Sequence, residues 1–410
     1  HQPIDPHMSD PTTTPVIASG VRTPVGRFLG GLSPLSAPQL GAVVVREAIR
    51  RAGIDGSAIE EVILGNVVQA GAGQAPARQA AIHGGVPGAV PAVTINKVCG
   101  SGLKAVMLAA QGIKAGDLQI ALAGGMESMS NVPYLVRGMR GGVKFGNQTL
   151  EDGLIHDGLW CSFGGCHMGG HAEYTADKAG VSREDADAFS LRSHRKAIAA
   201  MEAGKFDDEI VAVTVPGRKG DTVVERDESP RADTSIEKLA RLRPAFPKDA
   251  PEGVENLVVT AGTAPGLNDG AAALVVCSQA YAEAHGLTVR AEITGYASGG
   301  TEPQDLFFAP IVAVQRLMTK TGASVEDYDL VEVNEAFAVQ AIADMRALGM
   351  DEERVNVHGG AVALGHPIGA SGARVLVTLL SALEDRDQET GLATLCLGGG
   401  NAVALSVRRV

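Results

Sequence analysis

The sequence has few aromatic residues and no apolar run of membrane-spanning length. Phe, Trp and Tyr together make up 4% of the 410 residues, and there is a single tryptophan. A membrane-spanning helix needs about 20 consecutive apolar residues, and the N-terminus shows no signal peptide. We therefore expect a cytoplasmic protein with no membrane partner.

Positive charge and paired cysteines are also scarce. Acidic residues outnumber basic ones, so that the net charge is −12, and an acidic chain is a poor ligand for nucleic acid. The five cysteines are odd in number and scattered, which argues against a disulfide framework and suits a reducing compartment. We expect no nucleic-acid partner.

Glycine, by contrast, is abundant, with 52 residues. Apolar strands alternate with helices along the chain, which predicts an α/β protein whose sheets are covered by helices on both faces. The segment His1–Met8 is typical of a tag remnant, and we leave it out of the fold prediction.

The chain contains an internal repeat. Each copy has a buried strand that ends at an asparagine, Asn66 or Asn334, and a later Ser-Gly pair that opens a helix, at Ser101 or Ser371. The segments NDGAAALVVCS (268–278) and GGNAVALSVRR (399–409) are also alike. The repeat predicts two similar halves, of which only the first is interrupted by a long insertion.

We place the N-terminal half at 9–126 plus 258–285, the inserted loop subdomain at 127–257 and the C-terminal half at 286–410. Most of the clustered charge lies in the insertion. The predicted elements include the strands Val93–Val98 and Leu118–Ala123 and the helix Arg183–Ala203, which Ser182 caps.

Cys99 lies where a predicted strand turns into a helix. Gly100 and Gly102 permit a tight turn, and apolar residues recur at helical spacing from Leu103 onward. The free N–H groups and the dipole at a helix N-terminus favour a thiolate, the nucleophilic form of cysteine. We interpret Cys99 as a nucleophile; the alternative is a buried structural cysteine.

Three residues of the second half are candidates to work with Cys99. By the repeat, His366 in GGAVALGHPIGASGAR lies near the equivalent turn, where it can act as a base. Cys396 precedes Gly398–Gly400, whose N–H groups can hold an oxyanion, and the amide of Asn334 can orient water at a strand end. The alternatives are a turn histidine, a buried strand cysteine and a turn asparagine.

Two other segments have weaker interpretations. The stretch CSFGGCHMGGHAE (161–173) invites a metal site, but its spacing fits no standard zinc pattern, and we predict no metal. A substrate-lining loop or plain packing is the better interpretation of this stretch. A basic cluster in the insertion either receives the phosphates of a cofactor tail or forms an ordinary solvated surface. It comprises Arg218, Lys219, Arg231, Lys238, Arg241, Arg243 and Lys248.

Eight segments resemble the signature blocks of a known family, the thiolases. In chain order they are NKVCGSGLKAVMLA, GGMESMS, HMG, RLRPAF, GLNDGAAALVV, NEAFA, GGAVALGHPIGASGAR and CLGGGNA. The blocks extend over essentially the whole chain after the tag remnant. The resemblance is strongest to the short-chain members, which act on acetyl-CoA.

The resemblance implies a five-layered αβαβα core and a reversible Claisen condensation of two acetyl-CoA to acetoacetyl-CoA and CoA. Cys99 would carry the acyl group as a thioester, His366 would activate it, and Cys396 would deprotonate the second acetyl-CoA. One oxyanion site would use His366 and a water held by Asn334, and the other the N–H groups of Cys99 and Gly398.

The resemblance also implies how substrates bind. CoA and acyl-CoA would be substrates, with no tightly bound cofactor, and the insertion would hold CoA in a homo-oligomer, a dimer or a tetramer. The implied CoA contacts are Arg231, Lys238, Leu239, Phe246 and Ala264, and the implied acyl-pocket residues are His167, Met168 and Phe337.

Four features depart from the family pattern. Pro265 stands where a serine hydroxyl is frequent, so a pantetheine contact is lost there. His358 stands where asparagine is common, Gly100 replaces a frequent serine or alanine, and the linker 247–256 is long. These departures bear on the preferred acyl chain length.

Three other functions are open from the sequence. They are a degradative 3-ketoacyl-CoA thiolase for longer chains, a CoA- or lipid-binding protein without turnover, and a Cys–His hydrolase that uses water. Intact Cys99, His366 and Cys396 argue against the binding protein. The hydrolase leaves Cys396 and the basic insertion without a role.

Overall fold

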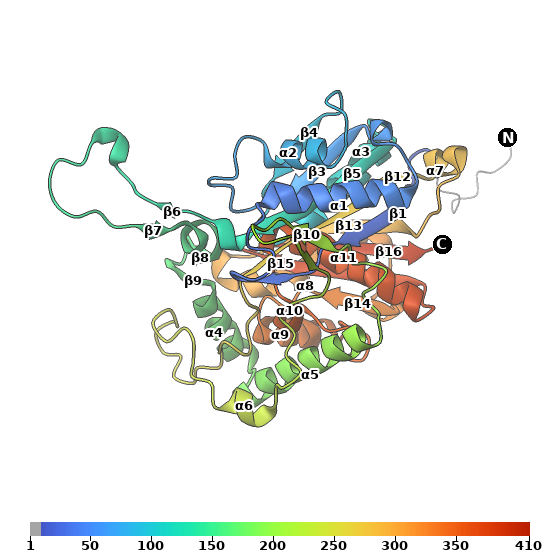
Figure 1. Cartoon of the computed structure of the whole chain (residues 1–410). Coiled ribbons are helices and arrows are strands. Elements are labelled where there is room, and N and C mark those ends of the chain that lie inside the picture. Colours follow the sequence, from blue (N-terminus) through green and yellow to red (C-terminus); the bar gives the residue numbers. More distant parts are fainter. Residues whose placement is uncertain (1–9) are drawn as a thin grey trace.

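The structure of the protein, a computed structural model, describes residues 10–410, and the predicted tag remnant His1–Met8 lies outside this range. A mixed sheet of ten strands runs through the described chain (Figure 1). Within residues 10–410, none of the helices combines the length and the apolar character needed to cross a bilayer.

The sheet takes strands from both ends of the chain. They are β1 (Pro15–Arg22), β2 (Gly26–Arg27), β3 (Glu61–Gly65), β4 (Ala92–Ile95), β5 (Ile120–Ser128), β12 (Asn268–Ser278), β13 (Ala291–Gly300), β14 (Leu330–Val333), β15 (Thr390–Leu397) and β16 (Asn401–Arg409). Across the sheet their order is β14-β15-β16-β13-β1-β12-β5-β3-β4, and β2 pairs with β12.

The two halves of the sheet repeat one pattern of pairing. From β1 through β12 and β5 to β3, and from β13 through β16 and β15 to β14, two antiparallel pairs precede one parallel pair. Both opening strands carry a register irregularity at the same place, between Ile17 and Ser19 in β1 and between Ile293 and Gly295 in β13. The halves join through the pairing of β1 with β13.

Helices cover both faces of the sheet. α1 (Ala37–Ala52) and α2 (Pro76–His83) pack on the outer side of the first half, and α8 (Ala309–Thr321) packs on the outer side of the second. α3 (Ser101–Ala115) and α11 (Ile368–Asp385) pack against each other and contact strands of both halves (Figure 1). The layers are therefore αβαβα, and this prediction is confirmed.

Glycine lets the two central helices approach closely. A Cβ at Gly102 in α3 would lie 2.6 Å from the backbone nitrogen of Ala373, and one at Gly372 in α11 would lie 2.3 Å from that of Leu103. The Ser-Gly pair of each repeat thus serves the contact between α3 and α11. Because both helices begin at this contact, the turns that precede them also come together.

The remaining elements lie along the chain between β5 and β12, between β12 and β13, or between β14 and β15. They are β6 (Tyr134–Leu135), β7 (Glu151–Asp152), β8 (Trp160–Cys161), β9 (Cys166–His167), α4 (Met168–Ala179), α5 (Arg183–Glu202), β10 (Val213–Val215), β11 (Thr222–Val224), α6 (Ile236–Ala240), α7 (Gln279–His285), α9 (Ala338–Leu348) and α10 (Ala361–Leu364). The chain between β6 and β7 projects from the body as a long arm (Figure 1).

Both predicted strands have other bounds in the structure: β4 begins at Ala92 instead of Val93, and β5 extends to Ser128 instead of Ala123. β4 ends at Ile95 instead of Val98, because Val98 has a φ of 47° and already belongs to the turn before α3. β5 begins at Ile120 instead of Leu118, because the N–H of Leu118 still donates to the carbonyl of Gly112 at the end of α3. The cap of α5 is as predicted, since Ser182 accepts a hydrogen bond from the N–H of Asp185.

Candidate active site

Cys99 lies in a strained turn between β4 and α3. Val98 adopts a φ of 47°, which is unfavourable for a β-branched residue. The side chain of Asn96 accepts a hydrogen bond from the N–H of Val98 at 2.9 Å. The hydroxyl of Ser101 accepts from the N–H of Lys97 at 2.8 Å and donates to the carbonyl of Val98 at 2.6 Å. These bonds hold the turn in place.

His366 lies in the corresponding turn before α11. Its N–H donates to Oδ1 of Asn268 at 2.9 Å, and Gly365, with a φ of 107°, leaves no room for a Cβ against the same side chain. Nδ1 of the ring lies 2.6 Å from the hydroxyl of Ser371, which donates to the carbonyl of Pro367 at 3.0 Å. That donation uses the only hydroxyl proton, so Ser371 accepts from Nδ1–H and the lone pair is on Nε2.

Cys396 lies near the end of β15, directly before a glycine loop. It is buried, and Gly399 and Gly400 have φ values of 79° and 82°. A Cβ at Gly100 would lie 2.7 Å from the side chain of Leu397. The glycine next to Cys99 therefore lets the Cys396 loop approach the Cys99 turn.

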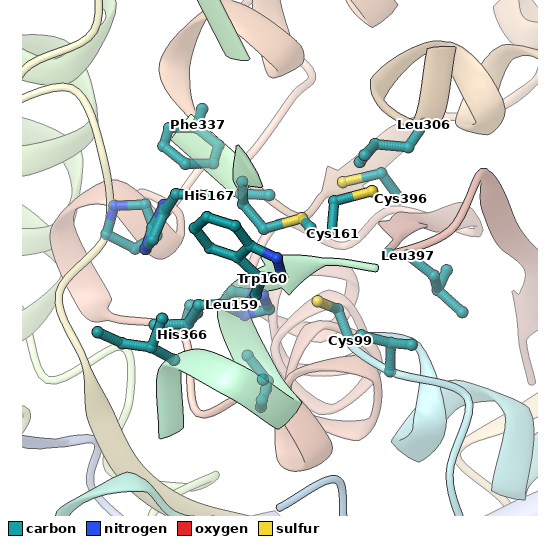
Figure 2. A pocket seen from close by; sticks show the side chains of 18 of the residues that line it. Cys99, Leu159, Trp160, Cys161, His167, Leu306, Phe337, His366, Cys396 and Leu397 are labelled. Carbon is teal, nitrogen blue, oxygen red and sulfur yellow. The ribbon is translucent and has the colours of Figure 1, made fainter. Parts of the chain in front are cut away.

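One cavity of about 470 Å³ brings these groups together. Cys99, His366, Cys396 and Gly398 line it, as the close-up in Figure 2 shows for the three side chains. Two thiols and an imidazole from distant parts of the sequence thus face the same space. The Claisen condensation that the family resemblance implies needs these three groups in one cavity.

Burial controls the protonation of the three side chains. It raises the pKa of Cys99 to about 12, although the N–H groups of Cys99 and Gly398 lower it in part. It lowers the pKa of His366 to about 3, and it raises the pKa of Cys396, beside Cys99, well above its ordinary value. Desolvation therefore outweighs the backbone groups that favour a thiolate at Cys99.

Asn334 directly follows β14 and is fully buried. Its neighbours Ala336 and Phe337 line the cavity, whereas Asn334 does not. Its N–H donates to the carbonyl of Thr394 at 3.0 Å, but the side-chain oxygen and nitrogen have no hydrogen-bond partner within residues 10–410. A buried amide with both polar atoms free is suited to hold an internal water.

The predicted acyl-pocket residues form an aromatic wall of the same cavity. His167, Met168 and Phe337 line it, together with the predicted CoA contact Phe246. The ring of His167 stacks on Phe246 at 4.6 Å, and Phe246 meets Phe337 edge-on at 6.2 Å. Nδ1 of His167 accepts a hydrogen bond from the N–H of Gly169, and burial lowers the pKa of this imidazole. His167 is therefore neutral, with its proton on Nε2.

A second cavity, also of about 470 Å³, continues from the first. Arg231, Lys238 and Leu239 line it, and Ala264 lies on the walls of both cavities. Lys238 pairs with Asp233 at 2.6 Å. The predicted CoA contacts therefore lie along one connected space. From the predicted basic cluster, Arg218 and Lys219 lie elsewhere, in the turn between β10 and β11.

The sequence analysis missed part of the cavity wall. The missed residues lie before α4 and before α8 and include Leu159, Trp160, Leu306 and Phe307. Trp160 is the only tryptophan of the chain, and it was a possible local signal. The other wall residues have no spacing that marks them, because only the fold brings the two segments together.

Comparisons with known proteins give the relatives of this chain. The family models for the N-terminal and the C-terminal thiolase domain match residues 15–280 and 287–409. An acetyl-CoA acetyltransferase from Pseudomonas aeruginosa is 53% identical over 395 residues, which cover 96% of this chain and 99% of that protein. One from Escherichia coli K12 is 51% identical over 396 residues, with 96% and 99% covered.

A solved structure agrees with these relatives. The crystal structure of the Bacillus anthracis acetyl-CoA acetyltransferase superimposes with a TM-score of 0.93 at 40% sequence identity, and the match covers 97% of this chain and 99% of that chain.

Proposed function

The chain belongs to the thiolase family, and we propose that it is an acetyl-CoA C-acetyltransferase. It condenses two acetyl-CoA to acetoacetyl-CoA and free CoA, and it catalyses the reverse thiolysis. The observation that carries this proposal is the shared cavity, which Cys99 and His366 line from the two repeated turns and Cys396 lines from the end of β15.

The first half-reaction forms the acyl-enzyme. Thiol and imidazole are neutral at rest, so Nε2 of His366 takes the proton of Cys99 as the sulfur attacks the thioester carbonyl of acetyl-CoA. The bond to the CoA sulfur breaks, and the leaving CoA takes the thiol proton of Cys396, so that Cys396 becomes a thiolate and His366 keeps the proton of Cys99 on Nε2. The hydrogen bond from Nδ1 to Ser371 keeps Nε2 directed at the thiols during this step.

The second half-reaction forms the carbon–carbon bond. The Cys396 thiolate takes a methyl proton from the second acetyl-CoA, and Nε2–H of His366, together with a water on Asn334, holds the oxygen of the resulting enolate. The carbanion attacks the acyl carbonyl on Cys99, whose oxygen receives the N–H groups of Cys99 and Gly398. Collapse releases acetoacetyl-CoA and returns the proton to the thiol of Cys99.

The connected cavities suit an acyl-CoA. The pantetheine arm passes Ala264 between the two cavities, and the phosphates lie near Arg231 and Lys238. Pro265 lines the first cavity and offers neither a hydroxyl nor an N–H to the arm. No tightly bound cofactor takes part in these steps.

Acyl-CoA substrates would place the enzyme in lipid metabolism, and its five free thiols suit the cytoplasm.

We also propose that the chain forms a homo-oligomer through the arm between β6 and β7 and the edge strand β4. The arm between β6 and β7 carries apolar side chains with little protein around them: Phe145 is 100% exposed, Tyr134 62% and Leu150 61%. Apolar surface of this kind is typical of a contact with another protein copy. β4 also lies at the edge of the sheet, where a second copy can pair with it.

Intact-protein mass spectrometry after mixing with acetyl-CoA tests the two thiols. We expect an added acetyl group on the wild type and on Cys396→Ala, and none on Cys99→Ala. We expect Cys396→Ala to form no acetoacetyl-CoA, and Cys277→Ala, the control in strand β12, to retain condensation. An acetyl group on another cysteine, or hydrolysis independent of CoA, would contradict the mechanism.

Thiolysis assays over a series of acyl chain lengths separate this activity from that of a long-chain thiolase.

A further inference from the structure

Two cysteines that have no role in the proposed reaction face each other in the hairpin of β8 and β9. We propose that Cys161 and Cys166 form a reversible disulfide, which makes this hairpin an oxidation-sensitive part of the cavity wall. All five cysteines are free thiols in this structure.

The register of the hairpin places the two residues opposite each other. Cys161 pairs with Cys166, and Trp160 pairs with His167. Opposed residues of an antiparallel pair have Cα atoms about 4.5–5.5 Å apart and side chains on the same face. Disulfides need a Cα separation of about 4.4–6.8 Å. The backbone is thus in range without a change of register.

Both sulfur atoms lie against the turn of this hairpin. The N–H of Gly164 donates to Sγ of Cys161 at 3.2 Å, and a Cβ at Gly164 would lie 3.4 Å from Sγ of Cys166. Gly165 has a φ of 63°, and its N–H donates to the carbonyl of Cys161 at 2.8 Å. The tight turn therefore keeps the two thiols next to the same glycine.

The two cysteines, on either side of the hairpin turn, line different cavities. Cys161 is buried and lines the cavity that holds Cys99 (Figure 2). Cys166 is half-buried and lines another cavity, of about 550 Å³, together with His171 and Asp249. A small oxidant such as hydrogen peroxide therefore has a route to Cys166 that does not pass through the catalytic cavity.

Hydrogen peroxide supplies the oxidising equivalents. The thiolate of Cys166 attacks one peroxide oxygen, the O–O bond breaks, and the leaving hydroxide takes up a proton as water. The sulfur of Cys161 then attacks the sulfenic acid at Cys166, and the second oxygen leaves as water with the thiol proton. Each sulfur loses one electron, and the peroxide takes up two. Burial, Cys161 and Asp249 all raise the pKa of Cys166, so oxidation is faster at alkaline pH.

The bond would act on the cavity through the residues beside it. His167 follows Cys166, its N–H donates to Asp249 at 2.9 Å, and its ring stacks on Phe246. A disulfide takes the sulfur of Cys161 away from the N–H of Gly164 and restrains the strand that carries His167. We expect the oxidised hairpin to raise the KM for acyl-CoA at least twofold.

Peptide mapping tests the linkage on the full-length chain. The Cys99→Ala/Cys396→Ala background removes two other oxidisable thiols, and the wild type is treated in parallel. After peroxide and iodoacetamide, chymotrypsin cleaves behind Phe163, between the two cysteines. We expect two peptides joined by a disulfide that dithiothreitol separates. Cys161→Ser and Cys166→Ser should give no joined pair.

Two results would overturn the proposal: alkylation of both sulfurs in the oxidised protein, or a disulfide from either of them to a different cysteine. The mass readout does not need turnover, so it stands whether or not the proposed acetyl transfer is correct.

For the effect on KM, peroxide-treated wild type is compared with treated Cys166→Ser before and after dithiothreitol. A reversible rise in KM should occur in the wild type alone, and an equal rise in Cys166→Ser would contradict a role for this hairpin.

Discussion

A single hydroxyl sets the chemistry of His366. Ser371 lies one turn into α11, donates its proton to Pro367 and accepts from Nδ1 of the imidazole. This leaves Nε2 unprotonated, and Nε2 has no hydrogen-bond partner within residues 10–410. A buried base with a free lone pair is ready to take a thiol proton, which an imidazole in the other tautomer cannot do.

Ser371→Ala should therefore slow acetylation of Cys99. The imidazolium that forms during attack loses a hydrogen bond worth about 1.5–3 kcal/mol, which corresponds to roughly a 10- to 100-fold lower kcat. Stopped-flow release of CoA measures this step. Ser381→Ala is a matched control, because Ser381 is buried on the same helix and its hydroxyl has no partner among the described residues. Equal kcat values for Ser371→Ala and the wild type would refute the assignment.

The protonation states of Cys99 and His366 give a second prediction. The pKa of Cys99 is about 12 and that of His366 about 3, so above pH 4 the imidazole is neutral and below pH 11 the sulfur is a thiol. In the Cys396→Ala background, alkylation of Cys99 by iodoacetamide should rise about tenfold per pH unit from pH 7 to 9. A rate that is already constant at pH 7 would indicate a preformed thiolate and contradict this account.

At the scale of elements, two helix starts determine the site. α3 and α11 meet through Gly102 and Gly372, and the turns that carry Cys99 and His366 directly precede them. The strained conformation of Val98 is held by two hydrogen bonds: its N–H donates to the side chain of Asn96, and its carbonyl accepts from the hydroxyl of Ser101. The positions of the thiol and the imidazole therefore depend on the packing between the two helices.

Gly372→Ala should separate these helices. Its Cβ would lie 2.3 Å from a backbone nitrogen in α3, so a backbone has to move, and we expect a loss of roughly 3 kcal/mol in the free energy of unfolding together with a large loss of turnover. Urea denaturation measures the stability. Gly88→Ala is the control, since the nearest atom to its Cβ is 3.9 Å away, in the side chain of Arg78. Comparable stabilities for the two variants would show that the helix contact tolerates a methyl group.

At the scale of the whole molecule, the exposed arm is the feature that a lone chain does not explain. Its tip carries Phe145, which has no cover, and Met139, which is 55% exposed. The arm projects away from the sheet and the helices that cover it (Figure 1). Its apolar side chains would be a liability in solution unless another copy covers them.

Replacing residues 136–149 with a short Gly-Ser linker should reduce the oligomer without unfolding the subunit. Light scattering after size-exclusion chromatography would then report a mass about half that of the wild type, if the arms join two dimers. Phe145→Ser with Met139→Ser is the milder variant and should weaken the same assembly. An unchanged mass in both variants would show that the arm does not hold copies together.

Much of the fold was predictable from local patterns. β3 and β14 end directly before Asn66 and Asn334, and α3 begins at its predicted Ser-Gly pair, because strand and helix periodicities act over neighbouring residues. α11, in contrast, begins at Ile368, three residues before Ser371. The predicted strand boundaries at Val98 and Leu118 differ from the structure, because a strained turn and a helix end override β propensity there. Local pattern does not report such effects, since they depend on the hydrogen bonds of the folded turn.

The sequence by itself determined the two repeated halves and the identity of Cys99, His366 and Cys396 as residues of interest, because residue types and spacing carry that information. Only the tertiary structure decided that the three share one cavity, that burial keeps the thiol and the imidazole neutral, and that Trp160 and Cys161 form part of the wall. Distances across the cavity and desolvation arise from segments that are far apart in the chain. They exist only once the two halves have packed around α3 and α11.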